Sequence, residues 1–183
     1  MRVDFHAYAD DCTVRGIVSL ATDRLTELLS DTGELSVDGV SFRALDDGRF
    51  VSAPRATILR GDLCAVSAAG PRGSSQRRVR TRLQPMRVKV GPYTIVGYLH
   101  APPTADPVVT ALRRRIIPLT SASIEYQLGG RRIEESHDAL LLSRDKIEWL
   151  AAATDKDVRL TGDFVVKRLV DPGAKDLTGA IVA

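Results

Sequence analysis

Two stretches of the chain share the same alternation of apolar and polar residues around a central glycine. Residues 12–19 read Cys-Thr-Val-Arg-Gly-Ile-Val-Ser, and residues 93–100 read Tyr-Thr-Ile-Val-Gly-Tyr-Leu-His. An alternation with a period of two residues predicts a β-strand that buries one face. Because the pattern occurs twice, we predict that one folding pattern is duplicated in this chain.

The first copy is predicted to contain a hairpin, a short helix and further strands. Residues 3–8 and 13–20 both alternate with a period of two, which favours a pair of strands. Apolar residues at helical spacing follow at 25–29, between Asp23 as the expected N-cap and Gly33 as the expected end. Further strands are expected at residues 37–45, 49–52, 57–59 and 63–66.

The second copy is predicted to repeat this order from residue 86 onwards. Residues 86–90 and 93–100 alternate like the first hairpin, and Asp106 before Pro107 is typical of the start of a helix. The later strands are expected to align residues 123–126 with 39–42, and residues 139–145 with 56–62.

These patterns predict a mainly β protein made of two tandem, related small β-barrel units, each with one short helix. We expect the first unit at residues 1–66 and the second at residues 86–150. Residues 67–85, rich in arginine, glycine and serine, are typical of a linker. Residues 151–183 are expected to form a C-terminal strand and tail.

The composition, with 44% hydrophobic and 27% charged residues, is that of an ordinary globular protein. No apolar segment is long enough to cross a membrane, and the N-terminus lacks the pattern of a signal peptide, so we expect a cytoplasmic protein without membrane contact. Cys12 and Cys64 each lie in an apolar segment, which favours two reduced thiols in the core over a disulfide or a reactive thiol.

Positive charge is concentrated in two places, although the net charge is only +3 and the isoelectric point about 9.1. Such arginine clusters could neutralise the phosphates of a nucleic acid or another anionic ligand. Aromatic residues on which bases could stack make up only 5% of the chain. A solvated linker and helix end therefore remain the simpler interpretation of Arg77, Arg78, Arg80, Arg82, Arg113, Arg114 and Arg115.

The pair Arg78-x-x-x-Arg82 before a predicted small β-barrel is similar to the arginine motif of the cyclic-dinucleotide-binding PilZ domain. That resemblance implies that the arginines grip phosphate and guanine. The family also has an Asp/Asn-x-Ser-x-x-Gly motif, and the nearest segment, residues 120–125, lacks both the acid or amide and the glycine. We therefore disfavour a PilZ-like function.

The second copy, with its hairpin, its short helix and the segments at residues 117–122 and 141–147, resembles an uncharacterised family of small bacterial Sm-like β-barrel domains. Residues 24–29 of the first copy resemble the short helix of that family. The resemblance implies the fold of a small barrel, here in tandem, and implies no particular activity.

The densest group of titratable residues is the run Glu134-Glu135-Ser136-His137-Asp138. Neighbours on a turn point in different directions, whereas a nucleophile, its base and an orienting acid must converge. We therefore expect an exposed loop between strands here, and no catalytic residues.

Metal ligands are also not expected, because two cysteines and three scattered histidines offer no recognisable metal framework. His6 and His100 fall on the outward side of their predicted strands and are expected at the surface. We accordingly predict neither a metal nor a cofactor.

These expectations lead to a non-catalytic module for protein interaction or assembly, with a protein partner or self-association. The alternative is a nucleic-acid or anionic-ligand binder, with a cyclic dinucleotide among the candidate ligands, that uses the two arginine clusters. An enzyme ranks third.

Overall fold

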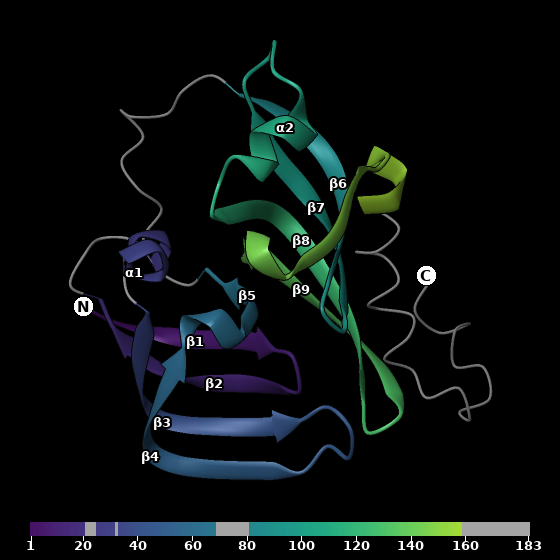
Figure 1. The fold of residues 1–183 in the computed structure, drawn as a ribbon. Helices are drawn as coiled ribbons and strands as arrows, with labels where there is room; N and C mark the ends of the chain where they lie inside the picture. The colour runs from purple at the N-terminus through teal and green to yellow at the C-terminus, as the bar shows by residue number, and fades with distance from the viewer. Residues whose placement is uncertain (21–24, 32, 69–80, 159–183) are drawn as a thin grey trace, which may run out of the picture.

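The computed structural model describes residues 1–20, 25–31, 33–68 and 81–158. Within them the protein is mainly β, and antiparallel strands form one hydrogen-bonded sheet with short helices at its margins (Figure 1). The strands are β1 (Arg2–Ala9), β2 (Cys12–Ser19), β3 (Glu34–Ala44), β4 (Phe50–Leu59), β5 (Leu63–Ser67), β6 (Arg82–Val90), β7 (Tyr93–Ala101), β8 (Ile116–Leu128), β9 (Arg131–Ser143) and β10 (Ile147–Ala152). The helices are α1 (Leu25–Asp31) and α2 (Pro107–Leu112), with the 3-10 turns η1 (Arg60–Asp62) and η3 (Arg144–Lys146), and residues 155–158 are also helical.

The strand order of the sheet is β10-β6-β7-β8-β9-β5-β1-β2-β3-β4. The strands up to β5 and those from β6 onwards therefore form two halves with the same internal order. Figure 1 shows these halves as two groups of strands that meet where β9 lies beside β5.

The structure corrects two expectations about the strands. Neither half closes into a barrel among the described residues, because β4 and β10 are the two edges of one open sheet. The strands expected separately at residues 49–52 and 57–59 form the single strand β4, which pairs with β3 from Phe50 to Leu59. Pro54 does not interrupt β4, because an edge strand can dispense with one backbone donor.

Gly16 and Gly97 lie at comparable places in the two halves. Gly16 is opposite Phe5 and lies within a bulge of the β2–β3 pairing, and Gly97 is opposite Met86 and lies within a bulge of the β7–β8 pairing. A Cβ atom on Gly97 would lie 2.9 Å from the Cβ and 3.1 Å from the Cα of Ala122. The central glycine is therefore needed for the close approach of the neighbouring strand.

Each half has its own hydrophobic core, and β5 and β9 form the wall between the two. Leu140 and Leu142 of β9 face the core of the second half, whereas Leu141 faces the core of the first. On β5, Ala65 faces the core of the second half and Val66 faces the core of the first. Where they pair, at residues 65–66 of β5 and 140–142 of β9, both strands are consequently apolar on both faces and do not show a simple alternation.

The local predictions for the two helices are confirmed where the structure describes them. The side chain of Asp106 accepts a hydrogen bond from the backbone N–H of Val109 at 3.0 Å, and Pro107 follows it as the first helical residue. Helix α1 lies within the predicted range, but Asp23 is outside the described residues.

The predicted linker and tail are described only at their margins. Residues 69–80 lie outside the described part, and β6 already begins at Arg82. At the C-terminus, β10 ends at Ala152 and residues 155–158 are helical. The rest of the expected C-terminal strand and tail, from residue 159 onwards, lies outside the described residues. No helix in the part that the structure describes is long and apolar enough to span a membrane.

Candidate functional site

The pairing of β5 with β9 joins the two halves into one sheet. Ala65 is opposite Leu142, and Val66 is opposite Leu141, in an antiparallel register. The backbone N–H of Ala68 extends the contact, because it donates a 3.0 Å hydrogen bond to the carbonyl oxygen of Ala139. One half therefore already recognises the other by adding a strand to its edge.

The two remaining edges of the sheet, β4 and β10, have no partner strand among the described residues. They carry exposed apolar side chains, because Trp149 of β10 is 46% exposed and Phe50, Val51 and Leu59 of β4 are at least half exposed. An edge strand presents unpaired backbone groups that can pair with another chain.

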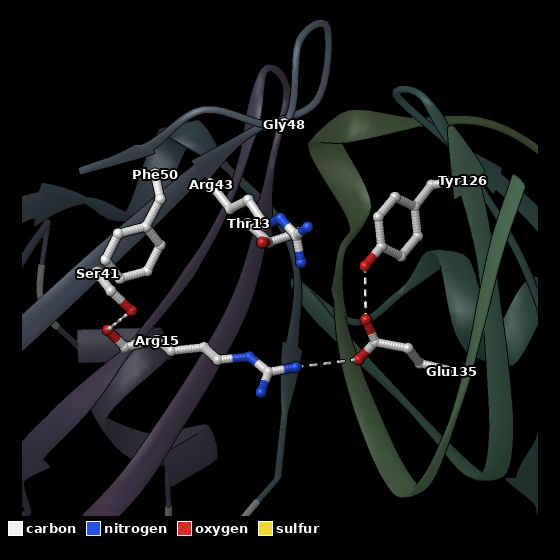
Figure 2. A pocket seen from close by; sticks show the side chains of 8 residues that line it. All are labelled: Thr13, Arg15, Ser41, Arg43, Gly48, Phe50, Tyr126 and Glu135. Carbon is white, nitrogen blue, oxygen red and sulfur yellow. Dashed lines mark hydrogen bonds and ion pairs between the residues drawn. The ribbon is translucent and has the colours of Figure 1, made fainter. Parts of the chain in front are cut away.

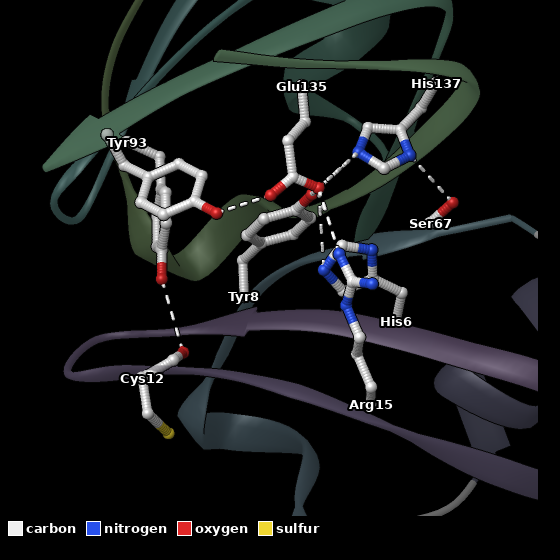
Figure 3. Close-up of polar contacts among 9 residues, drawn as sticks. His6, Tyr8, Cys12, Arg15, Ser67, Tyr93, Glu135 and His137 are labelled. Carbon is white, nitrogen blue, oxygen red and sulfur yellow. Dashed lines mark hydrogen bonds and ion pairs between the residues drawn. The ribbon is translucent and has the colours of Figure 1, made fainter. Parts of the chain in front are cut away.

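A polar cluster lies beside this junction and draws on strands of both halves. His6 and Tyr8 come from β1 and Arg15 from β2, whereas Glu135 and His137 come from β9 (Figure 3). On β1 and on β9 the two residues are separated by two positions, so each pair lies on one face of its strand. The antiparallel sheet brings the two faces together at the junction.

Glu135 is the centre of this cluster. Its Oε1 accepts a hydrogen bond from the Tyr126 hydroxyl at 2.5 Å, and its Oε2 accepts one from the Tyr8 hydroxyl at 3.1 Å. The guanidinium of Arg15 lies 3.5 Å from the same Oε2. Burial favours the neutral acid, but these hydrogen bonds and the nearby positive charge outweigh it and lower the pKa of Glu135.

The two histidines approach Glu135 from opposite halves. His137 Nε2 lies 4.0 Å from Glu135 Oε2 and 2.7 Å from the Tyr8 hydroxyl, and its Nδ1 lies 3.1 Å from the hydroxyl of Ser67. His6 Nε2 lies 3.9 Å from Glu135 Oε2 and is shielded from solvent, and it has no hydrogen-bond partner among the residues that the structure describes.

Burial lowers the pKa of His6 to about 4 and also lowers the pKa of His137. It raises the pKa of Tyr8, whose hydroxyl also faces the negative charge of Glu135. At neutral pH the cluster therefore combines two neutral imidazoles, a protonated phenol and an ionised carboxylate.

A cleft of about 420 Å³ opens beside the cluster (Figure 2). Arg15, Ser41 and Phe50 line it from the first half, and Tyr126 and Glu135 line it from the second. Figure 2 shows the Arg15 guanidinium reaching across the cleft to the Glu135 carboxylate. Glu135 therefore connects the buried cluster with the surface.

Sequence reasoning misplaced part of this cluster. Glu135 and His137 lie within β9 and not in an exposed loop, and the side chain of His6 is only 17% exposed although a surface position was expected. The sequence did indicate that the two polar residues of each strand share one face, because they are two positions apart on β1 and on β9. Nothing in the sequence indicated that these two faces would meet, because the strands are more than a hundred residues apart.

The candidate anion-binding residues are only partly described. Arg77, Arg78 and Arg80 lie outside the described residues. Arg82 is exposed at the start of β6, opposite the last residue of β7, and α2 follows β7. The structure therefore places the described members of both clusters at one end of the second half: Arg82, Arg113, Arg114 and Arg115.

The cysteines are two free thiols. Cys64 is fully buried in the second core, where its thiol donates a 3.1 Å hydrogen bond to Asp10. Burial raises the pKa of Cys64, and that of Cys12, to about 12. Neither thiol has the low pKa of a catalytic nucleophile.

Comparisons with protein families, with curated proteins and with solved structures find no match for this chain. The junction and the two sheet edges are therefore the features of the molecule that bear on its function.

Proposed function

We propose that this chain is a non-catalytic assembly module, a duplicated five-stranded unit whose copies join edge to edge, with β4 of one chain pairing with β10 of the next. The observation that carries this proposal is the pairing of β5 with β9 inside the chain. In the sheet order, β5 has the place in the first half that β10 has in the second, and β4 has the place that β9 has. The β5–β9 pair inside the chain is therefore the model for a β10–β4 pair between chains.

The correspondence between β5 and β10 follows from their partners. Val66 of β5 is opposite Ala7 of β1, and Leu150 of β10 is opposite Val88 of β6. In both pairs a 3-10 turn precedes the strand, and a register shift marks its start. Val66 and Leu150 therefore occupy equivalent positions.

The correspondence between β9 and β4 follows in the same way. Leu140 of β9 is opposite Leu119, and Ala56 of β4 is opposite Val37. Leu119 and Val37 each lie two residues before the bulge that their strand forms opposite the central glycine. Leu140 and Ala56 are therefore equivalent.

These equivalences supply the register of the proposed contact. Within the chain Val66 is opposite Leu141, so Leu150 of one copy should face Thr57 of the next. Ala151 should then face Ala56. Pro54 of β4 lies outside this segment and does not block its hydrogen bonds.

Repetition of the contact extends the sheet from copy to copy. The contact joins two different edges, so it is heterologous and produces a closed ring or an open chain of copies. The contact would cover Trp149 of β10 and lie beside Leu59 of β4, whereas Phe50 and Val51 are at the other end of β4, outside it. We also propose that the two halves are related to the small bacterial Sm-like domains that the sequence resembles.

Size-exclusion chromatography with light scattering tests the proposal. The wild-type chain should be an oligomer at micromolar concentration, and Trp149→Lys should shift it towards the monomer by placing a charge in the contact. Val109→Lys is the matched control, because Val109 of α2 is 47% exposed and lies on neither edge. A monomeric wild type, or an oligomer that Trp149→Lys leaves intact, would contradict self-association through these edges.

The same measurement with added RNA or DNA distinguishes the assembly module from the alternative, a nucleic-acid or anionic-ligand binder. A salt-dependent complex that disappears when Arg77, Arg78, Arg80 and Arg82 are replaced by Ala would favour nucleic-acid or anionic-ligand binding. Self-association that is insensitive to those four substitutions supports the assembly module.

A further inference from the structure

Three metal-ligating side chains converge beside the junction of the two halves. His6, Glu135 and His137 each offer one ligand atom, and these atoms all lie within 4.8 Å of one another. We propose that these three residues bind one divalent transition-metal ion, for which Zn²⁺ is the best candidate, between β1 and β9. The site lies within one chain, so it does not depend on the proposed self-association.

The outer atoms of two of these ligands are already held by hydrogen bonds. The hydroxyl of Tyr126 donates to Glu135 Oε1 and leaves Oε2 directed at the histidines. The hydroxyl of Ser67 lies 3.1 Å from His137 Nδ1 and can accept a hydrogen bond from it, which directs the lone pair of Nε2 inwards. Such outer hydrogen bonds orient the ligands of protein metal sites.

His6 provides an independent indication of a ligand. Its Nε2 is shielded from solvent, lies 3.9 Å from Glu135 Oε2 and has no hydrogen-bond partner in the described part of the chain. An unpaired buried polar atom costs free energy, and native structures rarely tolerate one. A metal ion bound at this nitrogen would remove that cost.

Two neighbouring groups would have to adjust when the ion binds. The Arg15 guanidinium lies 3.5 Å from Glu135 Oε2, but its side chain is 63% exposed and can turn into the cleft. The Tyr8 hydroxyl lies 2.7 Å from His137 Nε2 and would move aside or contribute its oxygen to the ion.

The donor set and the required movement both suit Zn²⁺. Zinc commonly takes imidazole nitrogen and carboxylate oxygen at about 2.0–2.2 Å in a tetrahedron, which places ligand atoms about 3.3 Å apart. The separations of 3.9 and 4.0 Å from Glu135 Oε2 need only a small inward movement of side chains. Glu135 also lines the cleft, so a water molecule can reach the fourth position.

Titration of the full chain, first freed of metal with a chelator, with Zn²⁺ alone tests the site. Isothermal titration calorimetry should show one ion per chain, and Zn²⁺ should raise the thermal unfolding temperature because it ties β1 to β9. Co²⁺ should show the visible absorption of a four-coordinate site. His6→Gln and His137→Gln should each lower the Zn²⁺ affinity by at least about tenfold, and Ser67→Ala by about tenfold.

His100→Gln is the matched control, because His100 lies on β7 and its ring nitrogens contact Thr81 and Thr120. It should bind Zn²⁺ like the wild type. Circular dichroism in the presence of chelator checks that each variant is folded, and His6→Asn replaces His6→Gln if the latter is not. No heat of Zn²⁺ binding to the wild type, or equal affinity in the His6 and His137 variants, would overturn the proposal.

Discussion

Glu135 illustrates how a buried charge is accommodated at the junction. Its two oxygens receive hydrogen bonds from Tyr126 and Tyr8, and Arg15 lies close enough to compensate the charge. Buried polar groups are stable only when such partners are present. These four residues come from four different strands, two in each half, so the folded junction creates the environment that Glu135 needs.

Gly97 permits the close approach of β8 to β7, and its substitution tests this at the level of one residue. We expect Gly97→Ala to lower the free energy of unfolding by about 1–3 kcal/mol, because the new methyl group overlaps backbone and side-chain atoms of Ala122. Urea unfolding followed by circular dichroism measures the loss. Gly33→Ala is the control, since apart from its chain neighbours no atom of the described residues lies within 4 Å of the added Cβ. A similar loss there would contradict this explanation.

At the scale of elements, periodicity predicted the positions of the strands well. It was less accurate for the alignment of the strands of the second half with those of the first. Residues 123–126 were aligned with 39–42, but the observed pairing makes Ser123 comparable to Ser41, a shift of two residues. A shift of two leaves every side chain on the same face of a strand, so the alternation could not detect it. The alignment of residues 139–145 was displaced by one residue. The alternation could not detect this, because residues 140–142 of β9 are apolar and buried on both faces.

Helix α2 depends on its N-cap, because six residues form few hydrogen bonds of their own. We expect Asp106→Ala to lower the free energy of unfolding by about 1 kcal/mol, since the N–H of Val109 loses its acceptor. Asp106→Asn retains a side-chain oxygen at this position and should remain within a few tenths of a kcal/mol of the wild type. Equal losses in both variants, measured by urea unfolding, would show that the cap does not stabilise α2.

At the scale of the whole molecule, the open sheet of the described residues leaves two edges that the proposed assembly would use. Its halves have the same strand order, and β5 and β9 already occupy each other's edges. The edges that remain are β4 and β10. A chain with two complementary edges can add copies without any change in its fold, and this supports an assembly module over a protein with one closed binding surface.

A cysteine pair tests the register of that contact between copies. We expect the double substitution Ala56→Cys with Ala151→Cys to form covalent multimers on mild oxidation, because directly opposite residues have Cβ atoms about 4.5–5.5 Å apart. Denaturing electrophoresis without reductant reveals the multimers. Ala53→Cys with Ala151→Cys is the matched control, since residue 53 lies about 10 Å further along β4. Equal cross-linking of both pairs, or of neither, would contradict the predicted register.

The sequence by itself determined the local structure of this protein. Alternation around Gly16 and Gly97 predicted the hairpins, and Asp106 before Pro107 predicted the start of α2. These features depend on which face of a segment is apolar and on contacts between neighbours in the chain. Both properties can be recognised in a single sequence.

Only the tertiary structure decided which strands meet and which edges remain free. Backbone hydrogen bonds between strands are the same for nearly any residue, so a pattern of buried positions does not specify the partner of β5 or of β10. The convergence of His6 with His137 depends on that choice, because residues from opposite halves become neighbours only when β5 pairs with β9. The junction, and the chemistry proposed for it, therefore arise from the packing of the two halves.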